Sequence, residues 1–117
     1  MIKLAGTWHI KAGDDPEEID RHYFDVHVPN VRRLPGLARH VIGKAIQDAA
    51  GGHPAAYRTA ETWFNTREDF DAAMASPEWQ AIADDGFMPS VAGLEIIIYE
   101  VEQEWTPDMP ADELPPR

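Results

Sequence analysis

The sequence predicts an α+β fold whose elements follow the order β-α-β-β-α-β. Two kinds of observation support this prediction. Strand-like apolar patterns recur along four stretches, residues 2–11, 37–47, 55–64 and 94–101. Two helical stretches lie between these strands. Each has a clear start signal, one just before residue 16 and one just before residue 67. This is the order of the ferredoxin-like split unit, in which both helical stretches pack on one face of a four-stranded antiparallel sheet.

The composition is typical of one soluble globular domain. Of the 117 residues, 44% are hydrophobic and 26% are charged, and the net charge of −11 opposes binding to nucleic acid and to anionic membranes. No apolar run approaches the ~20 residues that cross a bilayer, and no signal-peptide pattern is present, so we expect a cytoplasmic protein. The absence of cysteine excludes disulfides, thiolate metal sites and a cysteine nucleophile.

The first strand, residues 2–11, precedes a helix with a strong start signal. Asp15 is placed to cap this helix, and Pro16 suits its first position, where no backbone N–H is needed. Pro29 is expected to end it. Residues spaced by four along the helix share one face, which we expect to point toward the sheet: Ile19, Tyr23 and His27, with Val26 beside them.

The middle of the chain is predicted to form two strands and the second helical stretch. The strands at 37–47 and 55–64 are joined by a loop that is rich in glycine. Thr66 is placed to cap a helix, and Ser76 is placed to cap its continuation. The inward stripe of this stretch is expected to comprise Phe70, Ala73, Met74, Trp79, Ile82, Ala83 and Phe87.

The last strand, residues 94–101, is apolar on both faces and therefore predicts a partner. Leu94, Ile96 and Ile98 share one face, and Ile97, Tyr99 and Val101 share the other. Helices cover one face, so a second sheet must cover the other, and a homodimer is the simplest source of that sheet. The domain is expected to span residues 1–104, and residues 105–117, which are acidic and rich in proline, are expected to be extended or disordered.

Three residues are candidates for catalysis: His27, Tyr23 and His40. His27 lies near the expected helix end, where the helix dipole favours its charged form and burial favours its neutral form. Its pKa can therefore lie near neutrality, which suits proton transfer. The alternative is a structural histidine that ties the helix end to a backbone carbonyl. Tyr23 shares its face, and His40 faces one side of its strand, so either can orient a substrate oxygen.

Aromatic residues are numerous for a chain of this length, and some can line a pocket for a planar ligand. The candidates for substrate binding are Trp63, Trp79, Phe87 and Tyr57. No HExxH motif and no glycine-rich phosphate loop is present, so neither a metal nor a cofactor is expected. Asp84 and Asp85 place negative charge at a helix end, where it is unfavourable. Solubility and a separate role both remain explanations for this acidic pair.

One stretch resembles the signature of the EthD family, small proteins of the dimeric α/β-barrel superfamily. It is Tyr23-Phe24-Asp25-Val26-His27-Val28-Pro29-Asn30-Val31-Arg32-Arg33-Leu34-Pro35-Gly36-Leu37. A second block agrees, with Ala60-Glu61-Thr62-Trp63-Phe64 followed by Ser76-Pro77-Glu78-Trp79. The similarity, which runs over residues 2–103, implies that two four-stranded sheets close one barrel in a dimer. It also implies a ligand cleft between sheet and helices in each subunit, and it places the family's histidine at His27.

The resemblance implies a role among oxidoreductases, because the family is named for an ether-degrading oxidation system. Related barrels include cofactor-free monooxygenases, cyclases, isomerases and dehydratases. One hypothesis is a cofactor-independent enzyme that uses His27 on a carbonyl-bearing aromatic or polyketide-like molecule, in a catabolic or secondary-metabolic oxidation pathway. The alternative is a ligand-binding or accessory protein of an oxidoreductase system. A third hypothesis is a barrel protein whose conspicuous surface is only the dimer interface.

Overall fold

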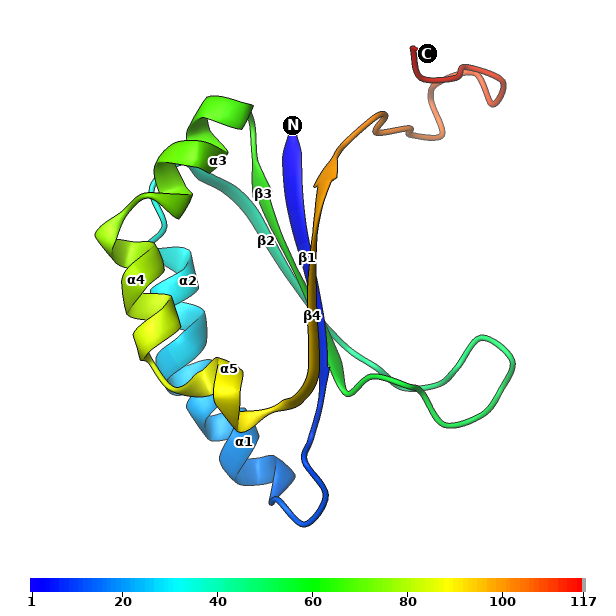
Figure 1. Cartoon of the computed structure of the whole chain (residues 1–117). Coiled ribbons are helices and arrows are strands. Elements are labelled where there is room, and N and C mark those ends of the chain that lie inside the picture. The colour runs from blue at the N-terminus through cyan, green and yellow to red at the C-terminus, as the bar shows by residue number, and fades with distance from the viewer. Residues whose placement is uncertain (117) are drawn as a thin grey trace.

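The chain forms one layer of sheet and one layer of helices, as a computed structural model describes for residues 1–116 (Figure 1). The sheet is antiparallel, with the strand order β2-β3-β1-β4. The strands are β1 (Ile2–His9), β2 (Leu37–Lys44), β3 (Arg58–Phe64) and β4 (Ala92–Glu100). The helical segments are α1 (Pro16–His22), η1 (Tyr23–His27), α2 (Val28–Arg32), α3 (Arg67–Met74), α4 (Pro77–Asp84) and α5 (Phe87–Ser90). The α+β ferredoxin-like fold predicted from the sequence is therefore confirmed.

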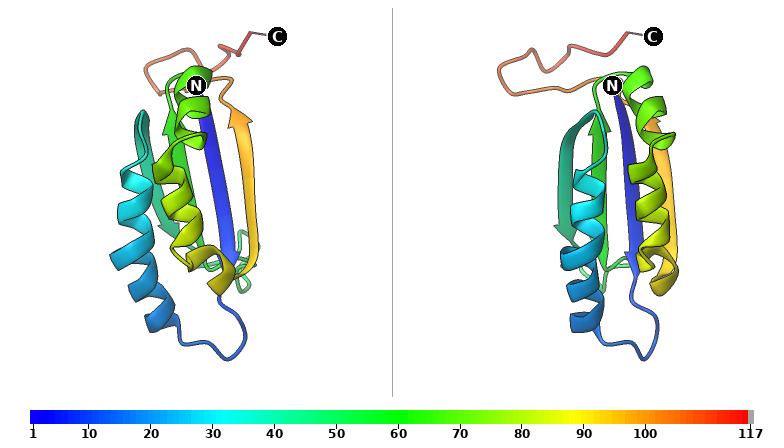
Figure 2. Two further views of the ribbon diagram at one scale, coloured as in Figure 1. Left: turned by 60° about the vertical axis from the view of Figure 1, so that its left-hand side comes forward. Right: turned by 90° about the vertical axis from the view of Figure 1, so that its left-hand side faces the viewer.

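The alternation along β1 decides which face of the sheet the helices cover. Ile2, Leu4 and Trp8 are buried on the helix side, and Leu4 pairs with Thr62 of β3 and with Ile98 of β4. The helices all lie on this side in the three views, and the opposite face of the sheet is bare (Figures 1 and 2). The loop between β2 and β3 and the segment after β4 both project on the bare side (Figure 1).

Pro29 does not end the first helix, contrary to the prediction. The helix continues through the π-helical segment η1, where the N–H of Val28 donates to the carbonyl of Tyr23, five residues earlier. A new α-helical segment, α2, then starts at Val28, and Pro29 falls in its first turn, where a missing N–H costs little. The wider turn also changes the inward face, so that Val26 is exposed rather than packed beside His27.

The second helical stretch begins and restarts where the sequence predicts. The Thr66 hydroxyl accepts from the N–H of Asp69, and the Ser76 hydroxyl accepts from the N–H of Trp79. Two residues of the predicted inward stripe are placed differently in the structure. Ala83 is exposed, and Phe87 belongs to the separate helix α5, because Gly86 turns the chain with a φ of 81°.

The strands β2 and β3 are shorter than predicted where they meet the loop 45–57. The β2 strand ends at Lys44 and β3 begins at Arg58, since Asp48 and Gly52 close a turn between them. After β4 the chain forms no helix or strand within residues 101–116, and it folds on itself through a hydrogen bond from Trp105 Nε1 to the carbonyl of Pro110. Among the described residues, no helix is both long and apolar enough to cross a membrane.

Candidate functional site

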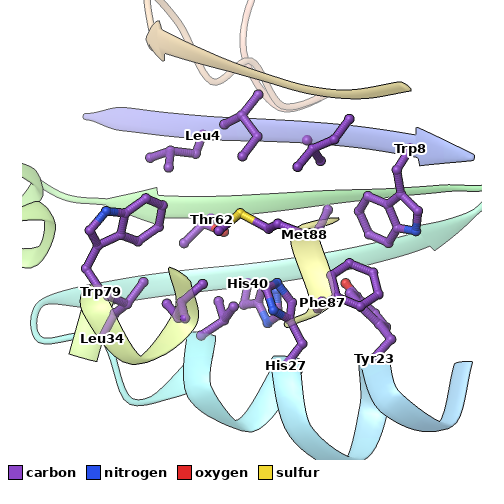
Figure 3. A pocket seen from close by; sticks show the side chains of 16 residues that line it. Leu4, Trp8, Tyr23, His27, Leu34, His40, Thr62, Trp79, Phe87 and Met88 are labelled. Carbon is purple, nitrogen blue, oxygen red and sulfur yellow. The ribbon is translucent and has the colours of Figure 1, made fainter. Parts of the chain in front are cut away.

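A pocket opens between the helix layer and the sheet, at the middle of the molecule (Figure 3). Its wall is mainly apolar, and the residues with polar side chains in it include Tyr23, His27, His40 and Thr62. The apolar lining comes from both layers and includes Leu4, Trp8, Val31, Leu34, Ile82, Met88, Leu94 and Ile96. Trp8 adds one buried N–H, Nε1, that has no hydrogen-bond partner within residues 1–116.

The chemically distinctive feature of the wall is a contact between His27 and Asp85. Nδ1 of His27 lies 2.8 Å from Oδ2 of Asp85, although 58 residues separate the two in the chain. The side chain of Asp85 is only 3% exposed and that of His27 is 12% exposed. A carboxylate accepts hydrogen bonds, so Nδ1 carries the proton and donates it. Nε2 of His27 is left with its lone pair and without a protein partner among residues 1–116.

Asp85 is held in place by groups from both ends of the helix layer. Its Oδ2 also accepts from Asn30 Nδ2 at 3.2 Å, and its Oδ1 accepts from the N–H of Phe87 at 2.9 Å, which caps α5. His22 Nε2 donates to the backbone carbonyl of Asp85 at 2.9 Å. Together with His27, these groups place three donors on one buried carboxylate and fix its direction toward His27.

The π-helical segment η1 presents Tyr23 and His27 to the same space. Their rings stack, with centroids 5.7 Å apart and an interplanar angle of 28°. The ring of Phe87 packs against both, with its centroid 4.5 Å from that of His27 and 5.0 Å from that of Tyr23. π-helical turns are rare and occur often at functional sites. Here the wide turn orients the histidine, and the aromatic rings fix its plane.

Burial lowers the pKa of His27 below the ordinary histidine value, and the negative charge of Asp85 and the hydrogen bond to it oppose this shift. The nearby His22 adds a smaller effect in the same direction as burial. The imidazole is therefore mainly neutral near pH 7, with Asp85 beside it to stabilise the positive charge after it takes a proton. This combination suits proton transfer.

His40 reaches the pocket from β2 and meets Arg32 from α2. Nε of Arg32 lies 3.3 Å from Nδ1 of His40. Burial lowers the pKa of His40, and the charges of Arg32 and His27 act in the same direction. His40 is thus also neutral near pH 7.

Tyr23 lines the pocket and is almost fully buried. Burial raises the pKa of its hydroxyl to about 12, against the opposing charges of Arg58 and Arg32. The hydroxyl therefore stays protonated and can act as a hydrogen-bond donor at neutral pH.

Two of the four aromatic residues expected to bind substrate line this pocket, and two do not. Trp79 and Phe87 form part of its wall. Trp63 lies on the bare face of the sheet, where the Lys3 ammonium is 5.1 Å from its ring, because its neighbours in β3 occupy the helix side. Tyr57 precedes β3, and its hydroxyl donates to Asp20 at 2.9 Å. Trp63 and Tyr57 therefore lie outside this pocket in the single chain, and substrate binding by the four aromatic residues stays a prediction.

Sequence reasoning did not pair Asp85 or Asn30 with His27. The only signal was the unfavourable negative charge of Asp84 and Asp85 at a helix end, which the sequence could not separate from solubility. The structure separates the two, because Asp85 is buried against His27 whereas Asp84 is exposed and accepts from Gln80. Within residues 1–116 no group of three or more histidine and acidic side chains is arranged to hold a metal ion.

Fold and site together define a small ferredoxin-like α+β domain with a ligand pocket between its sheet and its helices. Residues 11–87 match the EthD domain, and the chain belongs to the EthD family. A relative from Rhodococcus erythropolis, described as an uncharacterized 11.0 kDa protein in the thcB–thcC intergenic region, is 38% identical over 71 residues. The match covers 61% of this chain and 68% of that protein.

Solved structures show the same fold. An ethyl tert-butyl ether degradation (EthD) family protein from Bacillus halodurans C-125 matches with a TM-score of 0.72 and 27% identity, over 86% of this chain and 98% of that one. The hydroxynitrile lyase of Passiflora edulis matches with a TM-score of 0.70 and 16% identity, over 90% and 96%. SnoaB, a cofactor-independent oxygenase from Streptomyces nogalater, matches with a TM-score of 0.62 and 14% identity, over 88% and 94%.

Proposed function

We propose that the pocket is the active site of a cofactor-independent enzyme in which His27 is the general base. The observation that carries this proposal is the 2.8 Å contact between His27 Nδ1 and the buried Asp85 carboxylate. It fixes the tautomer with a free Nε2 lone pair at the edge of the pocket. A positioned base of this kind contributes roughly 10²–10⁴-fold to a rate.

The expected substrate is a small, largely apolar molecule that carries a carbonyl group, such as an aromatic or polyketide-like compound. The apolar wall matches such a skeleton, and Tyr23 can orient an oxygen with its protonated hydroxyl. The role we propose lies in a catabolic or secondary-metabolic oxidation pathway. Fold neighbours that are a hydroxynitrile lyase and a cofactor-independent oxygenase fit chemistry without a bound cofactor.

We also propose that the working form is a homodimer that uses the bare sheet face. Ile97 and Tyr99 are 42% and 43% exposed on this face in the single chain, and a second sheet would cover them. The alternative function is a ligand-binding or accessory protein of an oxidoreductase system. Such a protein would bind its ligand in the same pocket and form the same homodimer, but it would transfer no proton.

Proton exchange at a carbonyl compound distinguishes the two functions. The protein is incubated with 2-indanone, a compact aromatic ketone, in D₂O, and deuterium uptake next to the carbonyl is followed by NMR. We expect wild-type protein to accelerate uptake and His27→Gln to lose about 10²–10⁴-fold of that acceleration. His53→Gln, a histidine change in the exposed loop 45–57, is the matched control and should behave as wild type. Equal rates for His27→Gln and wild type would favour the accessory protein.

A further inference from the structure

The second histidine of the pocket is held by a group that lies outside the pocket. The turn at Pro35-Gly36, where Gly36 has a φ of 74°, brings the end of α2 beside the start of β2. Arg32 and His40 meet across this turn, with Arg32 Nε 3.3 Å from His40 Nδ1. Gly36 is needed there, because a Cβ would lie 3.3 Å from Asp69 Cβ on a backbone that side chains rarely adopt.

This contact determines which nitrogen of His40 carries the proton. A guanidinium only donates hydrogen bonds, so Nδ1 of His40 must accept. In a neutral ring the proton then lies on Nε2, which becomes a donor. The positive charge of Arg32 also opposes a second proton on the ring, so His40 stays neutral.

The two histidines of the pocket therefore have opposite tautomers. His27 donates through Nδ1 to Asp85 and keeps a free acceptor at Nε2, whereas His40 accepts at Nδ1 from Arg32 and keeps a donor at Nε2. Both rings line the same pocket, as Figure 3 shows. A ligand bound between them meets one group that takes a proton and one that gives a hydrogen bond.

We propose that Arg32 is a positioning residue that holds His40 as a neutral Nε2–H donor, so that the pocket enolises a carbonyl compound. This proposal rests on the proposed function of His27. In the step, His27 Nε2 takes a proton from the carbon next to the carbonyl. The electrons of that C–H bond form a C=C bond, and the carbonyl electrons move onto oxygen. The His40 Nε2–H donates to this enolate oxygen, and no oxidant or reductant is consumed.

Enolisation in this pocket requires both histidines. A base without a donor leaves charge on the enolate oxygen in an apolar pocket, which is costly. A neutral histidine donor aimed at a developing oxyanion lowers that cost, and it is better matched than a charged one when the base must remain neutral nearby. The substrate class that fits both groups is a ketone or ester with an acidic C–H next to the carbonyl and an apolar skeleton.

The tautomers can be measured without a substrate. Long-range ¹H–¹⁵N correlation spectra of the full chain at pH 7.5 report which ring nitrogen carries a proton. We expect Nε2–H for His40 and Nδ1–H for His27 in the wild-type protein. Arg32→Met should give His40 a mixture of both tautomers and leave His27 unchanged. Arg21→Met removes the same charge from an exposed position on α1 and should change neither.

The tautomer assignment is overturned if His40 carries its proton on Nδ1 in the wild-type protein. It is also overturned if Arg32→Met leaves the His40 tautomer as it was, or if Arg21→Met shifts it equally. The variant Arg32→Met changes an exposed side chain, so its folding is expected to be intact and circular dichroism checks this.

Exchange of 2-indanone protons in D₂O tests the chemical step. Loss of an oxyanion donor costs on the order of 10²–10³-fold in kcat, so His40→Phe should lose about that much. Arg32→Met loses only part of the donor population, so we expect a smaller loss of kcat than for His40→Phe, with little change in KM. Indane has the same skeleton without the carbonyl, and its binding should be equal in wild-type and Arg32→Met protein.

Failure of this inference and failure of the proposed function give different results. If His27→Gln abolishes exchange while Arg32→Met and His40→Phe match wild type, His27 is the base and the role of Arg32 and His40 is wrong. If His27 carries its proton on Nε2 and exchange is not accelerated, the proposed function itself fails. If the tautomers are as expected but wild-type protein does not exchange 2-indanone, enolisation of this substrate class is wrong and the accessory function is favoured.

Discussion

Asp85 is the residue whose role is most sharply defined by its surroundings. It is 3% exposed and receives hydrogen bonds from His27, Asn30 and the N–H of Phe87. A change to asparagine keeps the shape but replaces one acceptor with a donor. We expect Asp85→Asn to lower the rate of 2-indanone exchange about 10²–10⁴-fold by releasing the His27 tautomer.

Asp84→Asn is the control for this prediction. It removes one negative charge from the neighbouring exposed position, and exchange should stay within twofold of the wild-type rate. Equal losses for the two variants would mean that total charge, and not the contact to His27, sets the rate.

The pH dependence of the reaction follows from the neutral state of His27. The groups around its ring are Asp85 from the end of α4, His22 and Tyr23 from its own helical stretch, and His40 from β2. Burial lowers the pKa of His27, so the base is lost only below the ordinary value of about 6.5. The rate should be level above that pH and fall as the pH drops below it. A fall that begins above pH 7 would contradict a depressed value.

Stability should respond to pH with the same sign. The unfolded chain binds protons at His27 and His40 below about pH 6.5, whereas the folded chain resists them because burial lowers both pKa values. The free energy of unfolding should therefore decrease as the pH falls below 6.5. Urea unfolding at pH 7.5 and 5.5 measures this change, and His27→Gln should reduce it while keeping most of the stability at pH 7.5, since glutamine can still donate to Asp85.

At the scale of elements, the contact between β1 and β4 depends on one glycine. Gly93 has a φ of 60°, and a Cβ built on it would lie 2.6 Å from Cδ2 of His9, where the β1–β4 register shifts. We expect Gly93→Ala to destabilise the protein by about 1–3 kcal/mol through strain and displacement of His9. Thermal unfolding measures the effect.

Gly52→Ala provides the comparison, because a Cβ at Gly52 meets nothing within 4 Å. Its stability should stay within about 0.5 kcal/mol of wild type. If both glycine variants unfold at the same temperature, the close approach of β4 to His9 is not part of the folded protein in solution.

At the scale of the whole molecule, the bare sheet face is the face that no helix covers. The β4 strand exposes Ile97 on that face, whereas Ile98 points to the helix side at the sheet edge, where the helices leave it 54% exposed. We expect a dimer that buries more than the ~1,600 Å² of a standard interface. Light scattering at micromolar concentration should give the dimer mass, and a stable monomer would contradict the prediction.

Charge placed on that face should disrupt the dimer. Ile97→Asp puts an unpaired carboxylate where the second sheet is expected, and insoluble or monomeric protein should result. The two apolar faces of this strand in the sequence predict the same result for Ile98→Asp. In the structure, Ile98 lies on the helix side of β4, so Ile98→Asp leaves the bare face unchanged. A soluble dimer of Ile98→Asp together with insoluble Ile97→Asp would therefore assign the interface to the bare face.

The segment after β4 should be dispensable for folding of the domain. Its hydrogen bonds are mainly internal, such as those from Trp105 to Pro110 and from Gln103 to Glu113. A chain that ends at Glu104 should keep the melting temperature of the full chain. A loss of several degrees would show that this segment, which projects on the bare side in Figure 1, docks onto the domain or onto the partner subunit.

The sequence by itself determined the order of the elements, the starts of their main helices and most of their inward residues. The caps at Asp15, Thr66 and Ser76 and the alternation in β1 are local, since each is specified within one helical turn or a few strand residues. The inward direction of His27 followed from its spacing to Ile19. These signals do not depend on residues far away in the chain, and the structure confirms them.

Only the tertiary structure decided the chemistry. His27 and Asp85 are 58 residues apart, and their contact exists because α4 packs beside α2, the helix that continues the π-helical segment, over the sheet. The π turn itself, which carries the helix past Pro29, depends on hydrogen bonds that no local pattern specified. The pairing of Arg32 with His40 likewise arises from the turn that joins helix to strand. Side-chain contacts across elements are set by packing, and a single sequence holds no periodic signal for them.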